Sequence, residues 1–393
     1  MQQVFDEAVR LSMESGQAEL AWEVSERGRS RALLDMVRNR VKLAAGTEAY
    51  ADPFGKTVKL AELQALLKPG DALVEYHVLP ARSYAWIVRN GSVSAVTIEI
   101  RRGELAKQVE RLRDAVSQQK PNAAELGAKL YDVLLRPLGV KDGESLVIVP
   151  HDALHYAPFQ ALRDGNAYLI EKSAVSYAPS ASALAALLSG QAAKSGKLLA
   201  LGNPDLGNPQ FALPGAQREI ERIKTLFAES EVYFQKDATK QRLIASASKS
   251  NLVHIAAHAE VDALDPLYSR IRLARAGDEP GVLEAHEVYT MSLHTVGLIA
   301  LSACESGLGT VSRGDEIWGF TRSFLSAGSP ALLVSLWPVA DESTERLMTR
   351  FYQELGKGEA RAALRNAQIE VMKDPKFSHP FFWAPFNLVG DWR

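Results

Sequence analysis

The 393-residue sequence contains one cysteine, a nearly balanced set of charges and no long apolar run. A single cysteine excludes an internal disulfide framework and a zinc site made from several cysteines of one chain. The 45 basic residues almost equal the 47 acidic ones, so nothing in the charge favours nucleic acid or an anionic membrane as a partner. No apolar run reaches the roughly 18–20 residues of a membrane span, and the first 20 residues lack the apolar core of a signal peptide. We therefore expect a cytoplasmic protein in a reducing environment.

The chain has the composition of a globular protein, with 47% hydrophobic and 23% charged residues. Small and apolar residues recur at helical spacing over residues 1–42 and predict two helices, similar to the terminal unit of a helical repeat array. One such unit cannot bury both of its faces, so it must pack on the following domain, on a longer array or on a partner. Residues 43–58, with glycine, proline and aspartate, are predicted to form a linker.

The remaining chain is predicted to form two α/β halves, over 59–190 and 191–393. In the first half, three β-rich runs lie within 72–100, and Asn90-Gly91 predicts a hairpin between the last two. Helices over 104–117 and 122–136 and a strand over 145–150 follow. From about 196 onward, short apolar strands alternate with amphipathic helices, which predicts an α/β/α sandwich with a mainly parallel sheet.

Two residues at predicted strand ends can support nucleophilic chemistry. His258 follows the apolar run NLVHIAA, and Cys304 follows VGLIALSA, 46 residues later. Ligands and catalytic groups gather at the carboxyl ends of parallel strands. An imidazole beside a cysteine can generate the thiolate and later protonate a leaving amine. Sharp turns after these strands are expected to supply the backbone N–H groups of Ala259 and Cys304 as an oxyanion hole.

Several stretches occur in an order that resembles the CHAT-domain caspase-like cysteine peptidases, which are relatives of separase and caspases and are often fused to tetratricopeptide repeats. The resemblance covers nearly the whole chain. The matching stretches are SERGRSRALLD (25–35), LVIVPHDALHYAPFQAL (146–162), LPGAQREI (213–220), VHIAAHA (253–259), LSACESGLG (301–309), GDEIWGFTRSFLSAG (314–328), LLVSLWPVADEST (332–344) and HPFFWAPFNLVGD (379–391).

The resemblance implies that His258 and Cys304 form a catalytic dyad. It also implies a caspase-type fold in which a non-catalytic half, 59–190, precedes the active half, 191–393. Many relatives have glycine directly after the catalytic histidine, where this chain has Ala259. Bacterial relatives act in defence and regulated cell death, and no cofactor is implied.

Other residues near these positions have two interpretations each. His254 and His258 are four apart, the spacing of metal ligands on a helix, but a strand is predicted here and no third ligand lies nearby. We therefore expect no metal and assign His254 a supporting role. Asp341 and Glu345 begin a helix after the next strand; they either cap it or, as the resemblance implies, bind a basic substrate side chain. Asp315 has the same two interpretations, and Trp337 either lines that pocket or packs in the core.

The main functional hypothesis is a cysteine endopeptidase that cleaves a specific protein partner. A regulatory protein or repeat array is expected to dock on the N-terminal helices. The alternative is a latent or non-catalytic caspase-like scaffold that binds other proteins. A third possibility is another acyl-transfer reaction that uses the same dyad.

Overall fold

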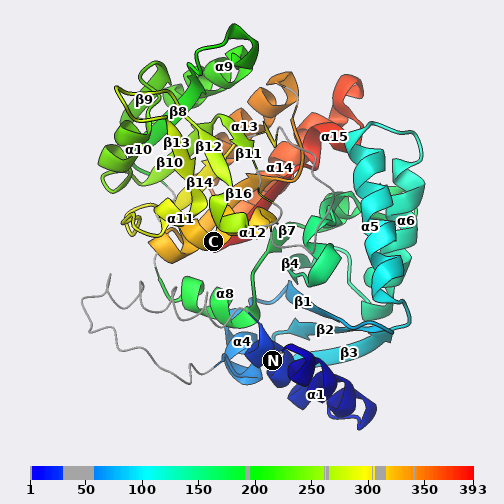
Figure 1. Ribbon diagram of the computed structural model, residues 1–393. Coiled ribbons are helices and arrows are strands. Elements are labelled where there is room, and N and C mark those ends of the chain that lie inside the picture. The colour runs from blue at the N-terminus through cyan, green and yellow to red at the C-terminus, as the bar shows by residue number, and fades with distance from the viewer. Residues whose placement is uncertain are drawn as a thin grey trace. The chain divides into compact units, whose positions relative to one another are not determined.

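The computed structural model describes residues 2–29, 57–190, 195–260, 262, 265–302, 304–305, 316–339 and 341–393. The chain divides into two compact units, Met1–Ala115 with Lys120–Gly190, and Val116–Gln119 with Gln191–Arg393. Figure 1 shows their helices and strands. Each unit is described by itself below.

The first unit contains a sheet in the order β3-β2-β1-β4-β7. Strands β1, β2 and β3 are antiparallel, whereas β1, β4 and β7 run parallel. The elements of this unit are α1 (Gln2–Glu14), α2 (Ala18–Gly28), α4 (Leu60–Leu66), β1 (Asp71–Val78), β2 (Ser83–Arg89), β3 (Ser92–Ile98), α5 (Arg102–Ser117), α6 (Ala123–Leu134), η1 (Arg136–Leu138), β4 (Ser145–Val149), η2 (Asp152–Tyr156), η3 (Phe159–Ala161), β5 (Arg163–Asp164), β6 (Ala167–Tyr168), α7 (Leu169–Lys172), β7 (Val175–Tyr177) and α8 (Ala181–Leu188).

Local sequence signals account for much of this unit. Arg89 pairs with Ser92 across Asn90-Gly91, which confirms the predicted two-residue hairpin. Gly91 has φ of 79°, a conformation that glycine adopts without steric cost. Within the segment 1–42 predicted to be helical, the structure has α1 and α2. Residues 30–42 of the helical prediction, and the linker up to residue 56, lie outside the described residues.

A buried polar cluster fastens α2 to strand β1. The Glu75 carboxylate on β1 accepts hydrogen bonds from Trp22 Nε1 at 2.7 Å and from Ser25 Oγ at 3.1 Å. Arg29 Nε lies 3.1 Å from the same carboxylate. Burial, followed by the nearby Glu26 carboxylate, raises the pKa of Glu75 to about 8. Glu75 therefore binds a proton at a higher pH than an exposed glutamate does.

The second unit contains a sheet in the order β17-β16-β14-β10-β8-β9, parallel except for β17. Helices α13 and α14 lie side by side (Figure 1). The elements are β8 (Leu198–Pro204), η4 (Pro209–Phe211), α9 (Pro214–Ile223), η5 (Lys224–Leu226), β9 (Ser230–Gln235), α10 (Lys240–Ala247), β10 (Leu252–Ala256), β11 (His258–Glu260), η6 (Pro266–Tyr268), β12 (Arg270–Arg272), β13 (Val282–Glu284), α11 (Ala285–Val288), β14 (Leu298–Leu301), β15 (Cys304–Glu305), α12 (Glu316–Ala327), β16 (Ala331–Ser335), α13 (Asp341–Leu355), α14 (Ala360–Lys373), η7 (Pro375–Phe377), α15 (Pro380–Trp383) and β17 (Phe386–Gly390).

This arrangement confirms the predicted α/β fold with a mainly parallel sheet. It corrects one local expectation: the chain does not make a sharp turn after His258. Strand β10 ends at Ala256, the chain bends at Ala257, and His258 opens a second strand, β11, of a small sheet in the order β13-β12-β11-β15. Continued pairing with β12 and β15 keeps the backbone of 258–260 extended. None of the helices in the described part of the chain is long and apolar enough to cross a bilayer.

Candidate active site

The backbones of His258 and Cys304 lie opposite each other in the small sheet. Strands β11 and β15 pair in parallel, and His258 is in register with Cys304. Each follows a strand of the large sheet, β10 or β14, and these two strands also pair in parallel. Because paired strands are about 4.8 Å apart, the fold brings residues 46 positions apart in sequence to adjacent backbone positions.

The His258 ring is held by a backbone carbonyl. Its Nε2 lies 3.0 Å from the carbonyl oxygen of Phe211 and can donate to it. The Phe211 ring meets the imidazole edge to face, with ring centroids 5.9 Å apart. A neutral imidazole carries one proton, so this bond places the proton on Nε2 and leaves Nδ1 as the basic nitrogen. The carbonyl therefore selects the tautomer that a general base requires.

Asn203 holds the loop that presents this carbonyl. It lies in β8, is 4% exposed and has φ of 47°, which is uncommon outside glycine but tolerated by asparagine. Its Oδ1 accepts a hydrogen bond from the Leu213 amide at 2.6 Å, and its Nδ2 donates to Gln217 Oε1 at 3.3 Å. Asn203 thus ties the residues that follow Phe211 to the strand. Strained backbone of this kind is frequent at functional sites.

A second set of buried polar groups surrounds His254, four residues before His258. His254 is fully buried, and its Nε2 lies 2.8 Å from Glu219 Oε1, within ion-pair distance but without ordinary hydrogen-bond alignment. Its Nδ1 lies 3.1 Å from the Tyr352 hydroxyl. Ser302, two residues before Cys304, donates to Glu219 Oε2 at 3.3 Å. Burial raises the pKa of Tyr352, so its hydroxyl remains protonated and can donate to Nδ1.

The supporting role of His254 beside the candidate dyad stays a prediction. The described residues contain no cluster of three or more histidine, cysteine, aspartate or glutamate side chains that could hold a metal ion. The two side-chain partners of His254, Glu219 and Tyr352, come from α9 and α13. Its contacts connect the strand before His258 with the strand end before Cys304.

The predicted substrate-pocket acids face helix α9. Glu345 is 8% exposed; it pairs with Arg222, and its Oε2 lies 3.6 Å from Arg218 Nε. Asp341, at the start of α13, is more exposed, and its Oδ2 lies 3.9 Å from Arg218 Nη2. A β-carbon built on Gly215 would meet the Asp341 side chain at 2.1 Å, so Asp341 packs closely on the first turn of α9. A substrate role for either acid stays a prediction.

The other predicted site residues have different placements. Trp337 is 1% exposed and donates from Nε1 to the Phe381 carbonyl at 3.1 Å, so it packs as a core residue, and its pocket role stays a prediction. Ala259 pairs with Ile271 on one side and Glu305 on the other. Its oxyanion role, like that of the Cys304 amide, stays a prediction. Asp315 lies outside the described residues.

Sequence reasoning missed four contributors to this site. The Phe211 carbonyl is a backbone group with no side-chain signal, and Asn203 resembles an ordinary turn residue. Tyr352 lies on the apolar face of α13 and resembles a core aromatic. Glu219 offered a signal: it is a charged residue at the same helical face as Ile220 and Ile223, both fully buried. A carboxylate in such a position needs a buried partner.

Comparisons with known proteins show the fold and the family of this chain. The Saccharomyces cerevisiae separase–securin complex matches with a TM-score of 0.61 at 11% identity, over 96% of this chain and 34% of that one. A second structure of that complex gives 0.59 over the same shares. These matches show a caspase-like α/β fold.

The CHAT domain profile matches residues 124–391, more than half of the sequence. The chain therefore belongs to the CHAT domain family. Two curated relatives, tetratricopeptide repeat protein 28 of Homo sapiens and of Mus musculus, are each 26% identical over 320 residues. Each match covers 66% of this chain but only 13% of the relative, so this chain spans a small part of those proteins.

Proposed function

We propose that this protein is a cysteine endopeptidase in which Cys304 is the nucleophile and His258 the general base. The observation that supports this proposal best is the register of His258 with Cys304, together with the bond from His258 Nε2 to the Phe211 carbonyl. A histidine in this tautomer, with its backbone in register with that of the only cysteine of the chain, supports activation of the thiol by the imidazole.

In the proposed reaction, His258 Nδ1 takes the thiol proton of Cys304, and the thiolate attacks the scissile carbonyl carbon. Negative charge develops on the carbonyl oxygen, for which we propose the backbone N–H groups of Ala259 and Cys304 as donors. The protonated imidazole then gives its proton to the leaving amine as the C–N bond breaks. Water, deprotonated by His258, hydrolyses the resulting thioester and releases the acid with the free thiol.

Under this proposal, the residues 59–190 form a non-catalytic half and 191–393 the active half. We propose a protein substrate and a regulatory partner on the N-terminal helices, by analogy with the repeat-containing relatives. We also propose a cytoplasmic location and a role in regulated cell death or bacterial defence. For the substrate residue before the cleaved bond, Asp341 is the better candidate of the two acids, because Glu345 is already neutralised by Arg222.

Thiol alkylation tests the activation of Cys304. An ordinary cysteine with a pKa near 8.5 is only about 1% thiolate at pH 6.5. Full ionisation would raise the thiolate fraction about 100-fold, and the lower nucleophilicity of a less basic thiolate reduces the net gain to about tenfold. We expect His258→Ala to slow iodoacetamide alkylation at pH 6.5 about tenfold. His286→Ala, an exposed histidine on α11, serves as the matched control. Equal rates in wild type and His258→Ala would refute the dyad.

Proteolysis tests the reaction itself. The protein and its Cys304→Ala variant are incubated with a proteome-derived peptide library, and the new termini are mapped by mass spectrometry. Cleavage that disappears in the variant supports the peptidase, and a basic residue before the cut that is lost in Asp341→Asn supports the pocket. Cleavage at non-peptide bonds would instead indicate another acyl transfer. Rapid alkylation with no cleavage by wild type would favour the alternative, a scaffold with a latent site.

A further inference from the structure

A cavity of about 550 Å³ lies in the second unit, beside the amino ends of strands β8 and β10. Lys197 and Asn251, which line it, each stand one residue before a strand, β8 or β10. His258 and Cys304 follow the carboxyl ends of β10 and β14. Because β8, β10 and β14 are parallel, the cavity lies at the amino ends of these strands and the dyad follows their carboxyl ends.

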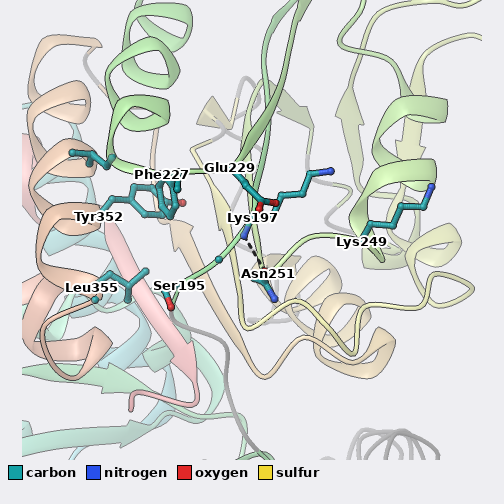
Figure 2. A pocket seen from close by; sticks show the side chains of 12 residues that line it. Ser195, Lys197, Phe227, Glu229, Lys249, Asn251, Tyr352 and Leu355 are labelled. Carbon is teal, nitrogen blue, oxygen red and sulfur yellow. Dashed lines mark hydrogen bonds between the residues drawn. The ribbon is translucent and has the colours of Figure 1, made fainter.

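The two sides of this cavity differ in chemistry, as Figure 2 shows. One side is formed by the apolar side chains of Phe227, Tyr352 and Leu355. The rings of Phe227 and Tyr352 meet edge to face with centroids 5.7 Å apart. The other side carries polar groups, among them Asn251 and Lys249. An apolar wall with a few polar groups beside it is the usual composition of a small-molecule site.

Three charged side chains line the cavity: Lys197, Lys249 and Glu229. Lys197 is neutralised by Glu231, whose Oε2 lies 2.6 Å from its ammonium group. Lys249 and Glu229, both exposed, have no ion-pair partner among the described residues. The Asn251 Oδ1 accepts from the Lys197 amide at 2.9 Å, so the Asn251 NH₂ group remains available to a ligand. A small zwitterion with an aromatic or apolar side chain matches this lining in both charge and hydrophobicity.

Tyr352 belongs both to this cavity and to the buried network beside the dyad. Its ring lines the apolar wall, while its hydroxyl lies 3.1 Å from His254 Nδ1. His254 contacts Glu219, and Glu219 accepts a hydrogen bond from Ser302, two residues before Cys304. Coupling between separate sites requires an element with two arrangements, and the contact between the Tyr352 hydroxyl and His254 is our candidate for it. A broken bond would leave His254 Nδ1 buried without its partner, at a cost in free energy.

We propose that this cavity binds an amino acid or similar zwitterion with an aromatic side chain, and that the ligand raises the reactivity of Cys304 through Tyr352 and His254. The ligand packs on the Tyr352 ring and stabilises the arrangement in which its hydroxyl bonds to His254. Binding of the ligand does not depend on the proposed function, whereas the effect on Cys304 rests on it. Coupling energies between sites are typically 1–3 kcal/mol, so we expect an increase of about fivefold in the alkylation rate.

Binding is tested by saturation-transfer NMR with L-phenylalanine as the probe. Phenethylamine and 3-phenylpropionate each lack one of its two charges and should bind more weakly. Gly356 lines the cavity, and a β-carbon there meets no atom within 4 Å, so we use Gly356→Trp to add a bulky side chain to the lining. Gly358→Trp is the matched control, because its β-carbon is equally unhindered and lies outside the lining. Loss of binding in Gly356→Trp alone supports the site. Absence of binding in wild type, or equal binding by all variants, refutes it.

Coupling is tested by alkylation of the single cysteine with and without L-phenylalanine. Tyr352→Phe keeps the aromatic wall and removes only the hydroxyl that contacts His254. We expect this variant to bind the probe while its alkylation rate no longer responds. A response that persists in Tyr352→Phe, or binding to wild type with no change in rate, refutes the coupling. Binding to a protein whose Cys304 is unreactive under all conditions would refute the proposed function and leave the ligand site standing.

Discussion

The raised pKa of Glu75 predicts that the first unit loses stability as the pH rises through neutrality. Glu75 is fully buried on β1, and burial, followed by the Glu26 carboxylate, raises its pKa from 4.5 to about 8. Between these two values the folded protein binds a proton at Glu75 that the unfolded chain does not. Stability is therefore fully present below pH 4.5 and is lost as the pH rises through about 8.

The size of the effect follows from the difference between the two pKa values. A pKa difference from 4.5 to about 8, at about 1.4 kcal/mol for each pKa unit, corresponds to about 5 kcal/mol over the whole range. Over pH 6.5–8.5 the expected loss is about 2 kcal/mol. Two other buried groups do not oppose it in this range, because burial lowers the pKa of His77 and of His151 and keeps both neutral.

Amide hydrogen exchange measured by mass spectrometry on peptides covering β1 gives the free energy of opening at each pH. We expect it to fall by about 2 kcal/mol in wild type between pH 6.5 and 8.5, and to remain nearly constant in Glu75→Gln, which cannot ionise. Glu144→Gln is the matched control in the same unit. Burial alone would raise the pKa of Glu144, but bonds from Arg89 and the Lys141 amide lower it, so this variant should lose stability without changing the slope. Parallel slopes in wild type and Glu75→Gln would refute the reasoning.

Two further predictions concern backbone positions. Asn203→Ala removes the bond to the Leu213 amide and places a less tolerant residue at φ of 47°, so alkylation of the cysteine at pH 6.5 should slow several-fold, toward the rate of the His258 variant. An unchanged rate would show that the loop does not depend on Asn203. In the first unit, Gly127→Ala brings a β-carbon to 2.8 Å from the Ala161 carbonyl and should cost about 1–3 kcal/mol in urea unfolding. Gly103→Ala, where the β-carbon meets no atom within 4 Å, should not destabilise.

Local chemistry explains why several elements were predictable. The Asn90-Gly91 hairpin follows from two residues that accept the turn conformation, and the apolar runs that became β4, β8, β10 and β14 are short and buried on both faces. The second strand at 258–260 was not predictable, because His258, Ala259 and Glu260 carry no strand pattern of their own. Their pairing with β12 decides that the chain continues as a strand after Ala257.

The candidate site also has features that were predictable from the sequence and features that were not. The sequence by itself determined the α/β fold class, the family motifs and the candidacy of His258 and Cys304, since these depend on residue type and order along the chain. Only the tertiary structure decided that the backbones of these residues are in register, that the Phe211 carbonyl accepts from His258, and that Glu219 and Tyr352 meet at His254. The physical reason is that hydrogen-bond partners of buried groups are chosen by packing between elements distant in sequence, and hydrophobic periodicity carries no information about which elements those are.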